Sequence, residues 1–119
     1  MQIIFDEKLV PILREKYTIL ELDTVMQPGL DNPVTLYALI ETVDLKILQQ
    51  LPDIVNQHEV MVRAYKNNEF DIAEFNANAL LGQWKGELDE FYNLVIETVN
   101  SMRDNNEIWT GIRHTEPDQ

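Results

Sequence analysis

The sequence contains no cysteine, which excludes disulfide bonds, thiolate nucleophiles and cysteine-ligated zinc. No stretch approaches the roughly 18 consecutive apolar residues that a membrane-spanning helix needs. The first residues lack the basic start and apolar run of a signal peptide. Only four glycines are present, and they form no glycine-rich phosphate-binding loop. We therefore expect a cytoplasmic protein with no membrane segment.

Positively charged residues are also scarce. The chain has nine Lys and Arg residues and 21 Asp and Glu residues, which gives a net charge of −12. A chain this acidic repels DNA, RNA and anionic lipid, and its basic residues are scattered along the sequence. Nucleic acids and membranes are thus excluded as expected partners. Two interpretations of the acidity remain open, namely solubility and attraction to a basic protein.

The length of 119 residues predicts one domain. We expect this domain to cover residues 1–103, with a β-hairpin element at 1–43 and a helical hairpin at 44–103. Residues 104–119 are predicted to form a polar, frayed tail. In this tail Ile108, Trp109 and Ile112 are the side chains able to dock.

The N-terminal half begins with a short apolar run, Ile3–Phe5, followed by a short helix. Asp6 is predicted to cap this helix, because its carboxylate can accept from the free amides of the first turn. Pro11 is tolerated only near a helix start, and we expect the helix to end near Lys16.

Alternating apolar and polar residues then predict two strands, at about 18–27 and 34–42. In the first strand Leu20, Leu22 and Met26 are expected on one face and Glu21 and Asp23 on the other. The segment between the strands is rich in turn-forming residues, including Pro and Gly. The two strands are therefore predicted to form an antiparallel hairpin. The edges of this hairpin are expected to be open, or covered by a partner or a helix.

After residue 43 the apolar residues recur every three or four positions, which is the period of an α-helix. This pattern predicts helices at about 45–67 and 71–103. Pro52 is expected at a helix boundary or in a first turn. Asp71 with Glu74 is predicted to form a capping box after a tight connection. Paired glycines at 82 and 86 favour a break in the second helix, whereas the periodicity favours continuity, so two or three antiparallel helices are expected. The predicted fold class is α+β.

The second helical region carries apolar residues that are expected to form one buried stripe. The members of this stripe are Ile72, Phe75, Ala79, Trp84, Leu88, Phe91, Val95, Val99 and Met102.

The hairpin sequence resembles the last β-hairpin of class III adenylate and guanylate cyclase domains. The resemblance lies in Leu22–Val25, Gly29 and Pro33–Tyr37, which follow that family's order of a Leu-Asp strand, a Gly-containing turn and a Pro-Val-x-x-Tyr strand. The segment Ile3–Tyr17 resembles the strand and helix that precede this hairpin. Ala64–Ala73 looks like the helix–turn–helix of a TPR repeat, which follows the cyclase domain in some members.

The resemblance implies a detached C-terminal segment rather than a working cyclase. The family's metal-binding aspartates and its catalytic Asn and Arg belong to upstream parts of the domain. Its hairpin turn often carries lysines that meet the triphosphate, whereas residues 27–30 here read Gln-Pro-Gly-Leu. No catalytic residue of the family is therefore carried over.

Other chemistry-bearing residues are few. His58-Glu59 matches the start of a zinc-binding helix motif that needs a second histidine four residues after the first. That position holds Val62, so we expect His58 to be a surface or partly buried residue. His114 lies in the predicted tail. Ser101 is the only serine, and nothing in its spacing suggests a nucleophile.

Two segments carry a pair of carboxylates three residues apart, namely Glu87 and Glu90, with Asp89 between them, and Glu41 and Asp44. On a helix this spacing places both carboxylates on one face, where they can bind Mg²⁺. Glu41 falls in a predicted strand, and solvated helix faces give such spacings by chance. Three aromatic residues, Trp84, Phe91 and Tyr92, are expected in the core rather than in a pocket. No catalytic, cofactor-binding or metal-binding residue is assigned.

The hypothesis that best fits these patterns is a non-catalytic protein-interaction or regulatory module. It is expected to bind a protein partner, and a homodimer is one form that this can take. The alternative is an enzyme, either a carboxylate-metal nucleotide hydrolase or one part of a split nucleotide cyclase completed by another chain.

Overall fold

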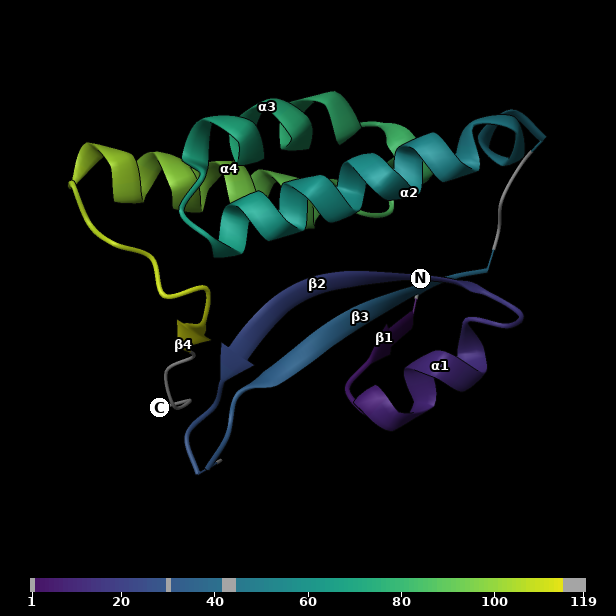
Figure 1. The fold of residues 1–119 in the computed structure, drawn as a ribbon, viewed down its shortest axis with the longest axis horizontal. Helices are drawn as coiled ribbons and strands as arrows, with labels where there is room; N and C mark the ends of the chain where they lie inside the picture. The colour runs from purple at the N-terminus through teal and green to yellow at the C-terminus, as the bar shows by residue number, and fades with distance from the viewer. Residues whose placement is uncertain (1, 30, 42–44, 115–119) are drawn as a thin grey trace. The chain divides into compact units, whose positions relative to one another are not determined.

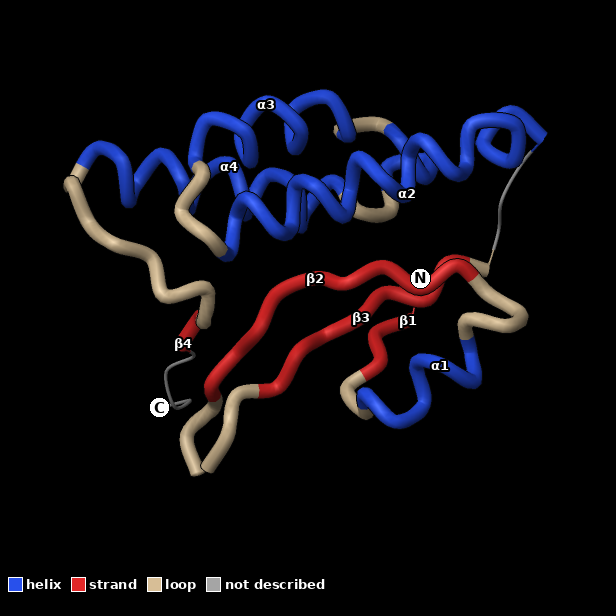
Figure 2. The backbone as a smooth tube through the Cα atoms, viewed as in Figure 1, coloured by secondary structure: helices blue, strands red, loops and turns tan. Residues whose placement is uncertain are grey.

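The computed structural model describes residues 2–29, 31–41 and 45–114. The chain divides into two compact units, one formed by residues 1–41 with 111–119 and the other by residues 42–110. The first unit is built on a four-stranded sheet and the second on helices (Figures 1 and 2). The predicted α+β class is therefore confirmed. None of the helices in the described ranges combines the length and apolarity required to cross a membrane.

The first unit contains the predicted hairpin, formed by β2 (Thr18–Met26) and β3 (Val34–Ile40), which pair antiparallel. The N-terminal strand β1 (Gln2–Ile4) pairs antiparallel with β3, and the C-terminal strand β4 (Arg113–His114) pairs in parallel with β2. The resulting strand order is β1-β3-β2-β4. Short segments of the same chain thus cover part of each hairpin edge.

One irregularity in β2 overturns the predicted placement of Asp23. The strand register shifts between Glu21 and Thr24, so β2 carries one residue more than β3 over this stretch. Such a β-bulge interrupts the alternation of faces. Asp23 is consequently buried, and its Oδ2 accepts a hydrogen bond of 2.7 Å from Nε of Arg113 at the C-terminal strand.

The helical turn after β1 packs on one face of this sheet. It consists of η1 (Glu7–Leu9) and α1 (Val10–Leu13), so the helix ends three residues before the predicted position. Asp6 caps it as expected, accepting from the backbone N–H of Lys8 at 3.0 Å. The small core of this unit joins the helical turn to the strands, and its members are Val10, Ile19 and Leu39, with Ile4, Leu13 and Tyr37 packed against them.

The second unit contains three long helices, α2 (Leu45–Lys66), α3 (Phe70–Leu80) and α4 (Asp89–Asp104). Successive helices run in opposite directions, and α3 contacts both α2 and α4 (Figures 1 and 2). The connection between α2 and α3 is tight, because Asn68 adopts a left-handed conformation and Glu69 N–H bonds back to the carbonyl of Ala64 at 2.9 Å.

The helical region predicted at about 71–103 is broken into two helices, as the glycines at 82 and 86 indicated. The break is a short 3-10 turn, η2 (Gln83–Gly86), that separates α3 from α4. Gly82, Trp84, Lys85 and Gly86 all have positive φ angles between 55° and 84°. Two of these residues are not glycine, so the segment stores backbone strain.

Two details of the helix boundaries differ from the predictions. Pro52 lies inside α2 rather than at a boundary, because a long helix can absorb the loss of one backbone hydrogen bond. Asp71 is not an N-cap, since α3 begins at Phe70 after Glu69 and no side chain caps it. The predicted capping box therefore does not form.

The segment after α4 docks on the helical unit through Trp109, one of the three side chains expected to do so. The indole is buried and lies 5.6 Å from the ring of Tyr65, centroid to centroid. The side-chain amide of Asn68 bonds both to the N–H of Trp109, at 2.7 Å, and to its carbonyl, at 2.6 Å. Ile108 does not dock and is 87% exposed.

Candidate interaction surface

Helix α3 exposes two of its large apolar side chains, Ile72 and Phe75, and buries two alanines and Leu80 against its neighbours. Ala73, Ala77 and Leu80 are buried, whereas Phe75 is 70% exposed and Ile72 is 46% exposed. The short alanine side chains allow α3 to lie close to both α2 and α4. The expectation that Ile72, Phe75 and Ala79 continue the buried stripe is therefore wrong, because a second stripe on α3, formed by Ala73, Ala77 and Leu80, is the buried one.

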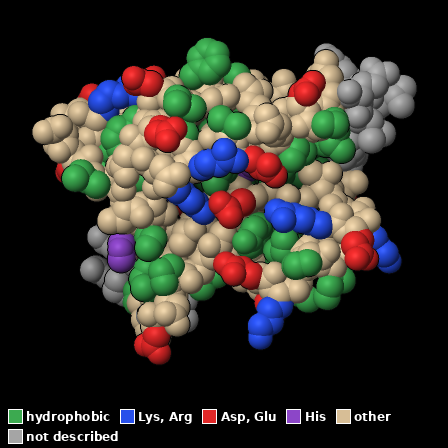
Figure 3. Space-filling model, viewed as in Figure 1, with side chains coloured by type: hydrophobic (Ala, Val, Ile, Leu, Met, Phe, Trp, Pro, Cys, Tyr) green, Lys and Arg blue, Asp and Glu red, His purple; other side chains and the backbone are tan. Residues whose placement is uncertain are grey.

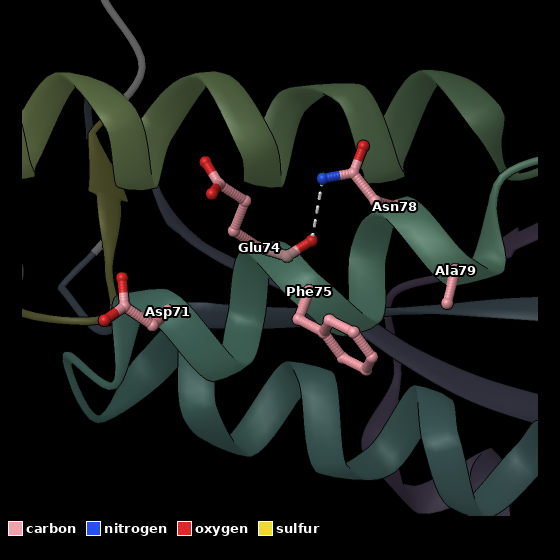
Figure 4. A pocket seen from close by; sticks show the side chains of 5 residues that line it. All are labelled: Asp71, Glu74, Phe75, Asn78 and Ala79. Carbon is pink, nitrogen blue, oxygen red and sulfur yellow. Dashed lines mark hydrogen bonds between the residues drawn. The ribbon is translucent and has the colours of Figure 1, made fainter.

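A shallow, largely open pocket of about 640 Å³ lies on this outer surface, lined by Asp71, Glu74, Phe75, Asn78 and Ala79. All five residues come from α3, at positions i, i+3, i+4, i+7 and i+8, so they share one face of the helix. Figure 4 shows the side chains of Glu74 and Asn78 pointing toward α4, with the ring of Phe75 pointing away from it. Asn78 is held in place by a bond of 3.0 Å from its Nδ2 to the carbonyl of Glu74.

The acidic end of this surface contacts one arginine from α4. The guanidinium of Arg103 lies 3.1 Å from Oδ1 of Asp71 and 3.6 Å from Oε2 of Glu74. Its Nη1 also donates to Oδ1 of Asn100 at 3.3 Å. The side chain of Asp71 is 95% exposed and that of Arg103 is 38% exposed, so water screens the ion pairs. Pairs of this kind contribute only about 0–1 kcal/mol.

We use the name α3 surface for Asp71, Ile72, Glu74, Phe75, Asn78 and Ala79 together. Figure 3 shows exposed hydrophobic side chains over α3 with acidic side chains beside them. An exposed apolar cluster rimmed by polar groups is typical of a binding site. Helix α3 itself contains two acidic residues and no basic residue, so it carries negative charge apart from its contact with Arg103.

His58, one of the residues singled out in the sequence, is fully buried, which corrects the expectation of a surface or partly buried position. Its Nδ1 lies 2.9 Å from the hydroxyl oxygen of Tyr92. The same oxygen accepts a hydrogen bond of 3.1 Å from Nε1 of Trp84. The three side chains connect α2, the turn η2 and α4, so we interpret the group as a structural network of the helical core.

Burial raises the pKa of the Tyr92 hydroxyl above its ordinary value of 10.0, and the negative charge of Asp89 acts in the same direction. The hydrogen bond from Trp84 opposes this shift. The prediction that Trp84 and Tyr92 lie in the core is confirmed, whereas Phe91 is only partly buried.

The predicted carboxylate pairs do not share a helix face. Glu87 precedes α4, whereas Glu90 lies in its first turn. Asp89 has a structural partner, because its Oδ1 accepts from the N–H of Gly82 at 2.9 Å. Glu41 follows β3 outside any regular element, and Asp44 lies outside the described residues.

The remaining candidates are dispersed over the fold. Glu59 is exposed on α2, His114 is exposed in β4, and Ser101 is exposed on α4, where Nδ2 of Asn105 lies 3.4 Å from its Oγ. Over residues 2–29, 31–41 and 45–114, no group of three or more His, Asp or Glu side chains is arranged to hold a metal ion.

Comparison of the chain with protein-family models, with curated proteins and with solved structures finds no match. The resemblance of the hairpin to cyclase domains, and of residues 64–73 to a TPR repeat, therefore remains a prediction from those residues alone. The α3 surface was missed in the sequence because its large apolar residues fit a buried stripe. The signal that could have found it is the competing stripe of Ala73, Ala77 and Leu80.

Proposed function

We propose that this chain is a protein-interaction module and that its α3 surface is the binding site. The observation that carries the proposal is the exposure of Phe75, whose relative accessible surface is 70% in the middle of a regular helix. Aromatic residues, Phe included, are enriched in protein interfaces, and a few buried anchor side chains carry most of the binding energy.

The fold supports this proposal because it holds the surface rigidly. Ala73 and Ala77, which are buried, lie next to the exposed residues on the same helix. The exposed side chains therefore project from a backbone that is fixed by packing on α2 and α4. A partner would meet a surface that is already ordered, which reduces the entropy lost on binding.

The orientation of α3 also distinguishes this surface from scattered exposed apolar residues. Phe75 lies between Ile72 and Asn78 on a continuous helical face, and Phe75, Asn78 and Ala79 line the same pocket. A pocket next to an aromatic side chain can accept an apolar side chain from a partner, and such insertion excludes water from the centre of an interface.

A peptide selection tests the proposal. A displayed library of random peptides is selected on the wild-type protein, and each enriched peptide is then measured against Phe75→Ala. We expect the dissociation constants to rise by about 10-fold or more, as for an interface hot spot.

The matched control is Phe5→Ala, which removes an aromatic side chain that is also exposed, at 62%, but belongs to the sheet unit. The enriched peptides should bind Phe5→Ala as tightly as the wild type. A selection that enriches no peptide, or only peptides that bind Phe75→Ala undiminished, would contradict the proposed function.

A further inference from the structure

We infer that the partner segment recognised by the α3 surface is cationic, with an arginine close to a large apolar side chain, and that Arg103 occupies the arginine position in the free protein. This inference rests on the proposed function and specifies the chemistry of the partner.

The contact made by Arg103 shows which group the acidic end of the surface accepts. One guanidinium reaches Asp71 at 3.1 Å and Glu74 at 3.6 Å from the neighbouring helix. A planar guanidinium with several donors suits two separated carboxylates better than a compact ammonium does. The site therefore favours arginine over lysine.

Arg103 is held loosely enough to be exchanged. Its side chain is 38% exposed, and Asp71 is 95% exposed, so water screens the contact. Among the residues that the structure describes, Arg103 also contacts Asn100, one turn earlier on the same helix, and this contact does not involve α3. An arginine from a partner can replace Arg103 without breaking the packing between α3 and α4.

The spacing along α3 defines the partner further. Asp71 and Phe75 are four residues apart, which is about 6 Å along a helix axis. A partner must place an arginine and an apolar side chain at a similar separation, as positions i and i+4 of a helix do.

A second copy of this chain is a poor occupant on electrostatic grounds. Each copy carries a net charge of −12, so two copies repel each other, whereas a basic segment is attracted. Charge complementarity therefore favours a different, basic protein over a homodimer.

The probes are two helical peptides of about 18 residues, long enough to form a helix. One carries leucine and arginine four residues apart, and the other has glutamate in place of each arginine. We expect the arginine peptide to bind the full chain, with an affinity that falls as salt is raised, and the glutamate peptide not to bind.

Arg103→Gln is the decisive variant, because it removes the internal competitor. It should tighten binding of the arginine peptide by roughly 2- to 5-fold, the range that corresponds to one exposed ion pair. Arg63→Gln removes the same charge from an exposed position on α2 and should leave the affinity nearly unchanged. Thermal melting of each variant checks that the fold is intact.

The outcomes separate this inference from the proposed function. If the library yields peptides that depend on Phe75 but are not enriched in arginine, the interaction site stands and the cationic partner is wrong. Weaker binding after Arg103→Gln also overturns the inference, because Arg103 would then contribute to the interface. Sedimentation that shows a dimer of the free chain, broken by Phe75→Ala, would overturn it in favour of a second copy.

Discussion

Helices α3 and α4 carry apolar residues at the same helical spacing, but the predicted apolar stripe is buried in α4 and exposed in α3. In α4 the residues Tyr92, Val95 and Val99 are buried, whereas in α3 the aromatic Phe75 is exposed and two alanines are buried. The difference arises because α3 contacts helices on two sides, and small side chains let it approach both. Periodicity therefore identifies a helix, but it does not by itself decide which of two stripes is buried.

The largest effect is expected at the turn between the two helices, where Trp84 is almost completely buried. Trp84→Ala removes a large core side chain and the N–H that bonds to Tyr92, so the free energy of unfolding should fall by about 3–5 kcal/mol. Urea unfolding measures this change. A loss below about 1 kcal/mol would mean that the indole does not pack in the core.

A smaller effect is expected from Tyr92→Phe on α4, which removes the hydroxyl and keeps the ring. The buried Trp84 N–H then loses its acceptor, and a buried donor without a partner costs about 1–3 kcal/mol. Urea unfolding of the variant provides the measurement, and Tyr17→Phe, which alters a partly exposed tyrosine, is the matched control. Equal stability of the two variants would contradict the role of the network.

The Tyr92 hydroxyl should also make stability depend on pH at alkaline values. Burial raises its pKa in the folded protein above 10.0, so above about pH 10 the folded state retains a proton that the unfolded state has lost. The stabilisation is full below pH 10 and falls as pH rises, by at most about 1.4 kcal/mol per pH unit.

Unfolding measured from pH 9 to 11 should therefore give a steeper decline for the wild type than for Tyr92→Phe. The pKa of Tyr37 is also raised, chiefly by burial, but Tyr37 is present in both proteins and does not affect their difference. Parallel curves for the two proteins would show that Tyr92 ionises alike in the folded and unfolded chains.

The smallest change in stability is expected from Phe75→Ala on α3. The ring is 70% exposed, and alanine favours a helix, so the free energy of unfolding should change by less than about 0.5 kcal/mol. Val95→Ala on α4 provides the contrast, because it shortens a fully buried side chain and should be clearly destabilising. Comparable losses for the two variants would mean that Phe75 is part of the core.

Much of the fold could be predicted from the sequence. The alternation around the Pro- and Gly-containing turn identified the hairpin, and the glycines at 82 and 86 indicated the break before α4. The position of Asp23 could not be predicted, because it depends on a bulge and on Arg113, which lies 90 residues further along the chain. The burial of His58 likewise depends on Tyr92, which lies on another helix.

The candidate site could be predicted only in part. Asp71 and Glu74 were recognised as a pair, but the pair was assigned to a helix cap, because the spacing of a capping box and of a shared helix face is the same. Their contact with Arg103 requires α3 and α4 to lie side by side. The exposure of Phe75 depends on the same packing, so the sequence pattern alone favoured the buried interpretation.

The most direct test of the α3 surface is the dissociation constant of the arginine- and leucine-bearing peptide, measured for the wild type and for Phe75→Ala under the same buffer and salt. We predict that Phe75→Ala binds about 10-fold more weakly or worse while its free energy of unfolding changes by less than about 0.5 kcal/mol. Equal dissociation constants for the two proteins would contradict it.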